Sequence, residues 1–483
     1  MGKKVIIIGA GLTGLSAGIY LQKKGIKTEI FEISGQAGGM CTAWVRSGYR
    51  FDSCIHWMVG TKPGGSYNDL YLEVGALEED TPIYNEEVLK SEFNNTILEI
   101  PIRFSAFKEY LLKSSPQDSK MIEDFCSQIE KIMLAKIPAG APKNLPALIR
   151  MVGESSAFLN MTRKYVGMTT KEYSDRFSNP SLKGIISTLM PPSYSAATLF
   201  MMLGTRMGGN AGYPLGGAYE VVRRMEKKYS SLGGVIHFNS KVDEIAVENG
   251  KATGIRSKGE IHAADSVIAA CDMYDTLKRM LGERYKHKQL DDMLESAELF
   301  QPLCYVSYGL DCRFGISSSL LLECPEGIKS TPDFVQNHIF VRAFDFDPSA
   351  APENCSSVMV SVESKLDYWQ TLRKENINEY KAMKQKLADE VTGVLDKKFP
   401  GFKDSIKVLD VSTPATYVRY ANVYKGSWEG FAPTPAALKT NIGKTVDGVK
   451  NLYLAGQWTT PGGGLCAAVQ SGKTTAEAVL KAK

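Results

Sequence analysis

The sequence contains little that would support a metal centre, a disulfide framework or a membrane span. Among 483 residues there are only five histidines, and the nine cysteines lie far apart without a C-x-x-C pair. This spacing indicates neither a zinc site nor structural disulfides, so the cysteines are expected to be reduced and buried. No uninterrupted apolar stretch reaches the roughly 18 residues that a membrane-spanning helix needs.

An excess of charge of one sign is also missing. The chain has 57 Lys and Arg residues against 53 Asp and Glu, a net charge of +4 at pH 7. This balance argues against nucleic acid as a partner. The apolar run 5–8 is too short for a secretory signal, and position 6 lacks the Ser or Thr of a myristoylation pattern. We therefore expect a cytoplasmic protein, with peripheral contact to a membrane left open.

What the sequence does contain is a nucleotide-binding pattern at its start. Residues 4–9 read Lys-Val-Ile-Ile-Ile-Gly, a run without alternation that predicts a parallel strand buried on both faces. The hexapeptide Gly-Ala-Gly-Leu-Thr-Gly follows at residues 9–14. The pattern then predicts a helix over 15–24 and a second strand over 27–31, which ends on Glu32. Together these elements predict an α/β fold with a Rossmann-type unit.

Each part of this unit has a physical reason. Gly9 allows a tight turn, Gly11 lets the backbone approach a pyrophosphate, and Gly14 lets the helix pack closely on the strand. The N–H groups at the start of the helix, around Leu12 and Thr13, can bind the phosphates. Glu32 lies where a carboxylate can accept hydrogen bonds from ribose hydroxyls.

Three further segments carry a resemblance to a known family. The first is Gly-Gly-Met-Cys at 38–41 with Phe-Asp-Ser-Cys-Ile-His at 51–56, the second is Tyr-Pro-Leu-Gly-Gly-Ala at 213–218, and the third is Asn-Leu-Tyr-Leu-Ala-Gly-Gln-Trp at 451–458 followed by Pro-Gly-Gly-Gly-Leu at 461–465. In this order they resemble the FAD domain of the phytoene desaturase and amine oxidase superfamily. The first segment is most similar to the retinol saturase branch.

The resemblance implies that the dinucleotide is FAD and that the glycines at 462–464 begin a helix able to support negative charge on a reduced flavin. Two positions depart from the family. Met40 stands where many members have Arg, and Gln457 stands where many have Asp, so its amide would bind a ribityl hydroxyl more weakly than a carboxylate. The cofactor-binding residues implied are Gly9, Gly11, Leu12, Thr13, Gly14, Glu32, Gly38, Gly39, Met40, His56, Val242, Ala270, Gly456, Gln457, Gly463, Gly464 and Leu465.

The resemblance also implies a discontinuous FAD-binding domain with an inserted α+β substrate domain. We expect the FAD-binding domain to comprise residues 1–85, 205–275 and 425–483, and the substrate domain residues 86–204 and 276–424. In the second insertion the sequence predicts strands at 303–310, 317–322, 339–342 and 356–364. A helix follows whose apolar stripe is expected in the core: Tyr380, Met383, Leu387, Val391 and Val394.

FAD performs hydride chemistry, and the protein positions the reactants and manages protons. The resemblance places His56 beside the flavin, where it is either a proton donor or acceptor, which a near-neutral pKa would suit, or a hydrogen-bonded core histidine. Tyr213, Tyr417 and Arg419 are weaker catalytic candidates, and no metal site is indicated. The apolar segment 196–203 is either core or the wall of a hydrophobic pocket. Segment 143–168 combines apolar and basic residues, which suits a packed helix or an interfacial segment.

The leading hypothesis is an FAD-dependent oxidoreductase that desaturates or saturates a C–C/C=C bond of a hydrophobic substrate, a carotenoid, retinoid or related polyene. The alternatives are a flavin amine oxidase, a non-redox isomerase that uses reduced flavin, and a non-catalytic prenyl- or lipid-binding protein. A second Rossmann fingerprint is absent, so a dedicated NAD(P) domain is not expected. The substrate, the reaction direction and the oligomeric state stay open at this point.

Overall fold

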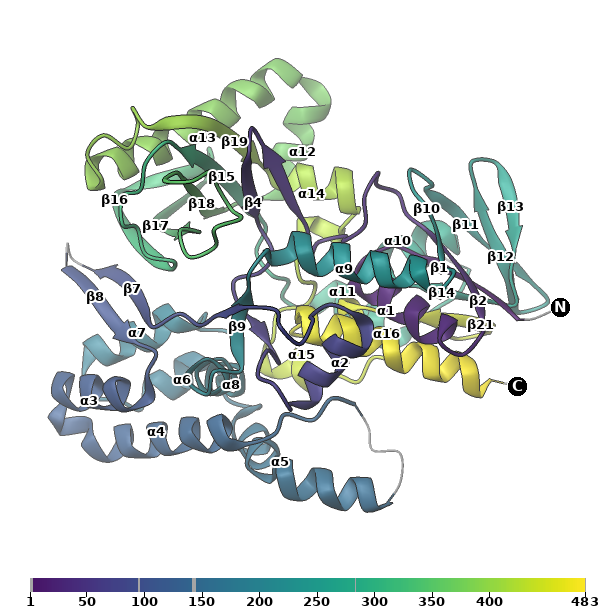
Figure 1. The fold of residues 1–483 in the computed structure, drawn as a ribbon, viewed down its shortest axis with the longest axis horizontal. Helices are drawn as coiled ribbons and strands as arrows, with labels where there is room; N and C mark the ends of the chain where they lie inside the picture. The colour runs from purple at the N-terminus through teal and green to yellow at the C-terminus, as the bar shows by residue number, and fades with distance from the viewer. Residues whose placement is uncertain (1–2, 94–95, 141–144, 283, 483) are drawn as a thin grey trace.

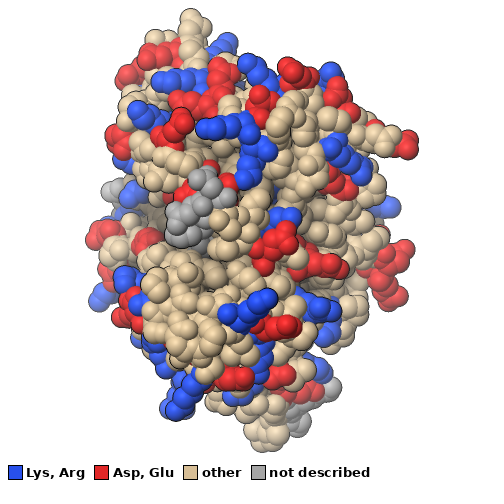
Figure 2. All heavy atoms as spheres, turned by 90° about the vertical axis from the view of Figure 1, so that its left-hand side faces the viewer, with Lys and Arg blue, Asp and Glu red and all other residues tan. Residues whose placement is uncertain are grey.

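The strands form two large sheets with helices packed between and around them (Figure 1). The structure is a computed structural model that describes residues 3–93, 96–140, 145–282 and 284–482. Both ends of the chain lie at the side of the first sheet, near its strands β1, β2 and β21. The face on the left of Figure 1 carries basic and acidic side chains in a mixed pattern (Figure 2), in keeping with the small net charge.

The first sheet contains nine strands, and its centre is parallel. The order is β10-β2-β1-β14-β21-β12-β11, with β13 beside β12 and β20 beside β21. Strand β1 pairs in parallel with β2 and β14, so it is buried on both faces as its sequence predicts. The bounds are β1 (Lys4–Ile8), β2 (Lys27–Phe31), β10 (Val235–His237), β11 (Val242–Glu248), β12 (Lys251–Ser257), β13 (Glu260–Ala263), β14 (Ser266–Ala269), β20 (Thr445–Val446) and β21 (Val449–Leu454).

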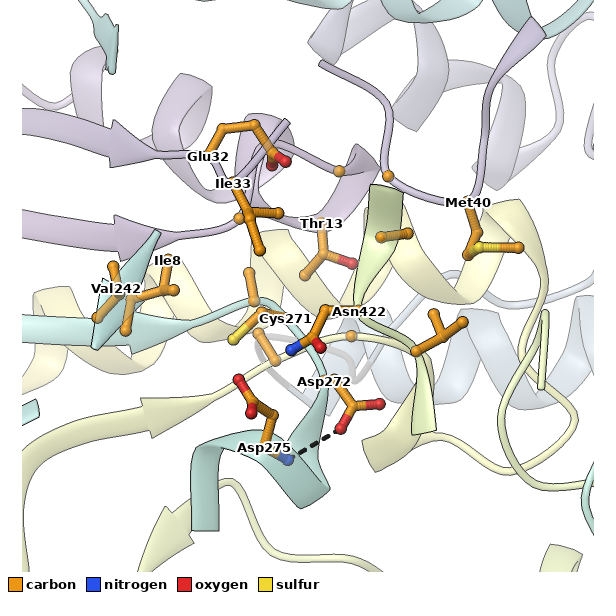
Figure 3. Close-up of a pocket in the computed structure, with 18 of the residues that line it drawn as sticks. Ile8, Thr13, Glu32, Ile33, Met40, Val242, Cys271, Asp272, Asp275 and Asn422 are labelled. Atoms are coloured by element: carbon orange, nitrogen blue, oxygen red, sulfur yellow. Dashed lines mark hydrogen bonds between the residues drawn. The ribbon is translucent and has the colours of Figure 1, made fainter. Parts of the chain in front are cut away.

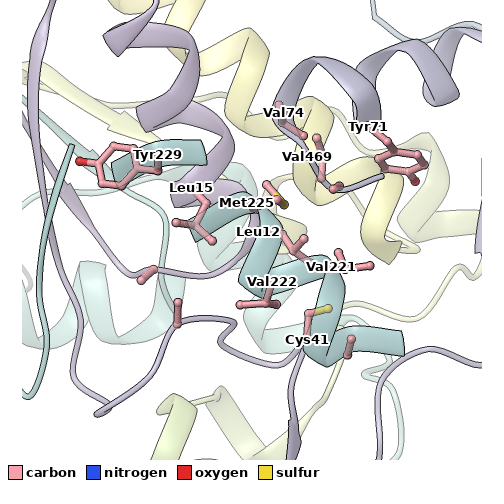
Figure 4. Packing of buried hydrophobic residues seen from close by; sticks show 14 of the residues in the cluster. Leu12, Leu15, Cys41, Tyr71, Val74, Val221, Val222, Met225, Tyr229 and Val469 are labelled. Carbon is pink, nitrogen blue, oxygen red and sulfur yellow. The ribbon is translucent and has the colours of Figure 1, made fainter. Parts of the chain in front are cut away.

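Two hydrophobic clusters cover the two faces of this sheet, because alternate residues of a strand point to opposite sides. Val5 and Ile7 pack against the helices of one face, while Ile6 and Ile8 pack on the other. Figure 4 shows the first face, where side chains of four helices converge. These helices are α1 (Leu12–Gln22), α2 (Ser66–Val74), α9 (Gly217–Ser231) and α16 (Gly464–Lys481). The other face is covered by α10 (Met273–Asp275), the π-helical turn η2 (Thr276–Met280), α11 (Lys288–Ser296) and α15 (Pro435–Lys439).

The second sheet contains seven strands in the order β19-β15-β18-β17-β16-β7-β8. As predicted, the apolar stripe of α13 packs on this sheet, with Tyr380, Leu387 and Val391 buried. One strand is misplaced in the sequence prediction, since the strand expected at 317–322 begins at Leu320 and runs on to Thr331. The bounds are β7 (Val88–Phe93), β8 (Thr96–Pro101), β15 (Leu303–Leu310), β16 (Leu320–Thr331), β17 (Phe334–Ala343), β18 (Ser356–Glu363) and β19 (Ile406–Ser412), with helices α12 (Leu366–Glu375), α13 (Ile377–Lys398) and α14 (Pro414–Ala421).

A group of helices below the second sheet has an aromatic core of its own, in which Phe125, Tyr173 and Phe200 contact one another. The apolar residues of segment 196–203 belong to this core, so they pack the helices together. The helices are α3 (Phe104–Ser114), η1 (Pro116–Asp118), α4 (Ser119–Leu134), α5 (Leu145–Tyr165), α6 (Thr170–Ser174), α7 (Pro180–Leu189) and α8 (Ala196–Met207).

Short elements connect these layers. Strands β3 (Ala43–Arg46) and β4 (Tyr49–Asp52) form a hairpin, and β5 (Met58–Val59), β6 (Ile83–Tyr84) and β9 (Ala211–Pro214) form a small sheet; the single turns are η3 (Tyr424–Gly426) and η4 (Gln457–Thr459). Among the described residues, no helix combines the length and apolar composition needed to cross a bilayer.

Candidate cofactor and active site

A pocket opens at the carboxyl ends of the parallel strands of the first sheet (Figure 3). Its walls begin where β1, β2, β14 and β21 end, and the empty space between them, open solvent included, is ≈ 990 Å³. The carboxyl edge of an open parallel sheet is where dinucleotides bind in such folds.

The glycine-rich turn after β1 has no room for side chains at two positions. Gly9 adopts a φ of 100°, and a Cβ there would lie 2.8 Å from the carbonyl oxygen of Ala270. A Cβ on Gly14 would lie 2.0 Å from the carbonyl oxygen of Gly9, so this glycine is required for the helix to approach the turn. Gly11, by contrast, faces the pocket, and only the Gly38 carbonyl oxygen, at 3.7 Å, is near its Cβ position.

Glu32 is buried at the end of β2, and its carboxylate lies at the pocket wall. The Oε2 atom accepts a hydrogen bond from the backbone N–H of Ala10 at 2.7 Å, and Oε1 accepts one from Ser34 N–H at 2.8 Å. Burial raises the pKa of Glu32, while these backbone hydrogen bonds act in the opposite direction. The acid therefore joins the glycine turn to β2 and presents its remaining lone pairs to the pocket.

Twelve of the predicted cofactor residues come together in this pocket: Gly9, Gly11, Leu12, Thr13, Glu32, Gly38, Gly39, Met40, Val242, Ala270, Gly456 and Gln457. Gly14 packs beneath the turn. His56, Gly463, Gly464 and Leu465 are not part of the pocket lining. The Gln457 side chain is directed at the carbonyl oxygen of Trp428, with Nε2 at 3.5 Å.

Comparison with known proteins decides the family. Residues 12–480 match the family described as flavin containing amine oxidoreductase. The chain belongs to this family. Its cofactor is FAD, and the residues of the pocket fit that group: an acid at the end of β2, a glycine turn with close backbone approach, and a long cavity along the strand ends.

Relatives in the family match the chain over nearly its whole length. It is 26% identical to a chloroplastic prolycopene isomerase of Daucus carota, with 98% of this chain and 79% of that protein covered. It is 24% identical to a lycopene-forming phytoene desaturase of Pseudescherichia vulneris, with 99% of both covered. It is 21% identical to an all-trans-retinol 13,14-reductase of Danio rerio, covering 94% of this chain and 82% of that one.

Solved structures share the fold at low sequence identity. An oxidoreductase from Methanosarcina mazei superimposes with a TM-score of 0.60 at 19% identity, covering 98% of this chain and 100% of that one. Cyclohexylamine oxidase from Brevibacterium oxydans gives a TM-score of 0.61 at 15% identity, with 99% of both chains covered.

Sequence reasoning missed a polar group on the far wall of the FAD pocket. Asp272 accepts hydrogen bonds from the backbone N–H groups of Asp275 and Tyr424, and burial raises its pKa to about 7. Asp275 forms an ion pair with Arg279 at 2.6 Å. Asn422, which ends α14 with a φ of 50°, completes this wall. The sequence Asp-Met-Tyr-Asp at 272–275 is typical of a helix start, and this pattern could have indicated Asp272 and Asp275.

His56 differs from its sequence expectation. Arg342 donates hydrogen bonds to the carbonyl oxygens of Ile55 and His56, and its guanidinium lies over the ring of Tyr213. Burial, with Arg342 and Arg206 nearby, lowers the pKa of His56 to about 3. The imidazole is therefore neutral across the physiological range, whereas a near-neutral pKa was expected. Its ring packs on Phe340 at a centroid distance of 5.5 Å.

The other catalytic candidates occupy different environments. Tyr213 is buried, and its hydroxyl donates to Asp52 Oδ2 at 3.1 Å, which also accepts from Ala218 N–H at the start of α9. Tyr417 is buried with its ring 6.3 Å from that of Tyr305, and burial raises its pKa well above the usual value. Arg419 is exposed and lies over the ring of Tyr420, so it points away from the interior.

Proposed function

We propose that this protein is an FAD-dependent oxidoreductase that saturates or desaturates a carbon–carbon bond of a hydrophobic polyene. The observation that carries the proposal is the full-length match to relatives named phytoene desaturase and retinol 13,14-reductase, combined with the FAD pocket. When bound, FAD supplies or accepts a hydride at such a bond.

The residues of this chain then have separable roles. The Gly9–Gly14 turn and Glu32 would hold the adenosine diphosphate half of the cofactor, and the segment from Gly38 to Met40 together with Gln457 would hold the flavin half. His56, outside the pocket lining, contributes a neutral ring among aromatic side chains, beside the rings of Trp57 and Phe340. Apolar and aromatic surfaces of this kind suit a conjugated hydrocarbon and exclude water from the reacting bond.

The domain division is part of the same proposal. The first sheet takes its strands from 4–31, 235–269 and 445–454, and the second from 88–101 and 303–412. We assign FAD binding to segments 1–85, 205–275 and 425–483, and substrate binding to segments 86–204 and 276–424.

The experiment is a substrate panel with product masses. Protein reconstituted with FAD is incubated with phytoene, prolycopene or all-trans-retinol, with the flavin supplied oxidised or reduced, and products are analysed by chromatography and mass spectrometry. A gain or loss of two hydrogen atoms supports the proposal. A product of unchanged mass identifies an isomerase instead, the activity named for the carrot relative. Oxidation of an amine panel with no change in any polyene contradicts the proposal.

We also propose that α5 touches a lipid surface, through which a hydrophobic substrate enters. Leu145 and Ile149 on α5 are 67% and 66% exposed, and Leu134 at the end of α4 is 81% exposed. Arg163 and Lys164 are exposed in the last turn of α5. Exposed apolar residues accompanied by basic ones are typical of interfacial helices. Lys143, at the start of the predicted segment, lies outside the described residues.

A further inference from the structure

A carboxyl group that sequence reasoning did not single out lies next to the flavin end of the pocket. Glu429 is in the loop between η3 and α15, and this loop is held firmly. The Ser427 hydroxyl donates to the Gly430 carbonyl oxygen at 2.8 Å, and Phe300 N–H donates to the same oxygen at 3.1 Å. Gly430 has a φ of 81°, and its Cβ position lies 3.4 Å from the ring of Trp458, which lines the pocket.

The Glu429 side chain lies over the first residues of α16. A Cβ on Gly463 would lie 2.4 Å from Glu429 Cγ, and a Cβ on Gly464 would lie 3.5 Å from Glu429 Oε1. A side chain on Gly463 would displace that of Glu429, whereas the Cβ position of Gly464 is in ordinary van der Waals contact with the carboxyl. The backbone of Gly464 also provides a hydrogen bond to it. The carboxyl therefore has a defined position at the glycine-rich start of α16.

The position of Glu429 relative to the pocket follows from the direction of the cofactor. Glu32 and the Gly9–Gly14 turn fix the ribose and pyrophosphate at one end. Met40, Gln457 and Trp458 line the same pocket, and we assign Met40 and Gln457 to the flavin half of the cofactor. Glu429 adjoins this part of the pocket, because its neighbours Trp428 and Gly430 contact Gln457 and Trp458.

The titratable groups that face Glu429 are Cys54, Tyr194, Tyr305 and Cys466. Burial raises the pKa of the last three, and a hydrogen bond with Cys41 together with burial raises that of Cys54. All four are neutral at pH 7, and no ion pair of Glu429 occurs within the described part of the chain. Glu429 as a residue is half-buried, and protein surrounds its carboxyl. Burial raises its pKa to about 8.

We propose that Glu429 is the acid that exchanges the proton in the carbon–carbon bond reaction. In the saturating direction, the C=C bond takes up one hydride, which reduced FAD supplies, and one proton, which moves from the Glu429 carboxyl to the other carbon. In the desaturating direction, one carbon loses a hydride to oxidised FAD and its neighbour loses a proton to the Glu429 carboxylate. In both directions, atoms and electrons balance with FAD and the Glu429 carboxyl as the only groups that exchange hydride and proton with the substrate. The inference rests on the proposed function.

His56 cannot take this role as an acid, since its imidazole is already neutral well below pH 7. Glu429 differs in that its protonated form persists to about pH 8 and its ionised form is reached just above. A group whose pKa lies near the working pH is the most efficient proton donor or acceptor.

The test compares Glu429→Gln and Glu429→Asp with Glu226→Gln. Glu226 on α9 is the matched control, because burial raises its pKa as well and it does not line the pocket. The first measurement uses the apoprotein: infrared difference spectra between pH 6 and pH 10 should show a protonated carboxyl band that titrates near pH 8. Asp272 also titrates in this range, near pH 7, so all proteins are measured in the Asp272→Asn background. There the band should be absent in Glu429→Gln and present in Glu226→Gln. A band that Glu429→Gln retains in this background overturns the proposal.

The second measurement is turnover per bound flavin of a polyene that wild-type protein converts. Glu429→Gln should bind FAD normally and lose about 10²-fold or more in turnover. Glu429→Asp should recover part of the loss, and Glu226→Gln should match wild type. Normal turnover by Glu429→Gln overturns the role of Glu429 while leaving the proposed function standing. Failure of wild-type protein to convert any polyene contradicts the proposed function itself.

Discussion

The carboxylate of Glu32 accepts a hydrogen bond from the backbone N–H of Ala10 at 2.7 Å. The residue expected to recognise the ribose thus also fixes the turn that approaches the pyrophosphate. Loss of Glu32 is expected to affect both the shape of the empty site and the contact with the cofactor.

We predict that Glu32→Ala weakens FAD binding by about 1–3 kcal/mol, the cost of a lost charge-assisted hydrogen bond. Flavin fluorescence titration of the apoprotein gives the dissociation constant. Glu29→Ala is the control, since Glu29 is on the same strand but pairs with Lys4 and His237 outside the pocket. Equal affinities of Glu32→Ala and wild type would exclude Glu32 from cofactor binding.

Gly14→Ala should destabilise the fold and release flavin, because its Cβ would lie 2.0 Å from a backbone oxygen that cannot move freely. Overpacking of this kind costs about 1–3 kcal/mol. Gly153→Ala on α5 is the control, as its Cβ position meets nothing within 4 Å and alanine favours the helix by up to about 1 kcal/mol. Thermal melting and flavin absorbance are the measurements. A Gly14→Ala protein that is yellow and melts like wild type contradicts the close packing.

Asp272 should make the apoprotein less stable as the pH rises. Its pKa in the folded protein, about 7, lies above the usual 3.8 because the carboxyl is buried. The stability that this group contributes is therefore complete below about pH 3.8 and is lost as the pH rises through 7. Relative to Asp272→Asn, wild type should lose unfolding free energy between pH 5 and pH 8 in urea denaturation. If the difference in unfolding free energy between wild type and Asp272→Asn is the same at every pH, the raised pKa of Asp272 is refuted.

The α5 face should bind anionic lipid. We predict that the protein sediments with liposomes containing phosphatidylserine, that added salt weakens this binding, and that replacing Leu145 and Ile149 together by Ser abolishes it. Ile261→Ser on β13 is the control, an apolar residue 61% exposed on another surface. Sedimentation that is unaffected by the α5 substitutions would place the lipid contact elsewhere.

The sequence predicts the first strand, the glycine turn, α1 and β2 well because these depend on neighbours along the chain. Val5 to Ile8 carry their own burial pattern, and Gly9 and Gly14 have local steric reasons. The strands of the second sheet are harder to predict from the sequence. Strand β16 passes through Pro325 and Gly327, residues typical of turns, and the register shift between Glu323 and Ile328 accommodates them.

Long-range contacts explain what sequence reasoning missed in the site. Asp272 and Asn422 reach the same wall of the pocket from segments about 150 residues apart. The pKa of His56 is lowered first by burial and then by Arg342 and Arg206, which belong to other elements and lie far from it in the sequence. Local patterns carry no information on such pairings, so the sequence alone suggested a titrating histidine.

The packing of α16 on α1 has a consequence for how the protein is made. Thr13 and Ser16 on α1 donate hydrogen bonds to the carbonyl oxygens of Ala468 and Val469, and β21 lies in the middle of the first sheet beside β14. During translation, the turn at 9–14 emerges roughly 450 residues before these partners. Until the partners emerge, the sheet is incomplete and has an open edge at β14, so we expect FAD to be captured only afterwards.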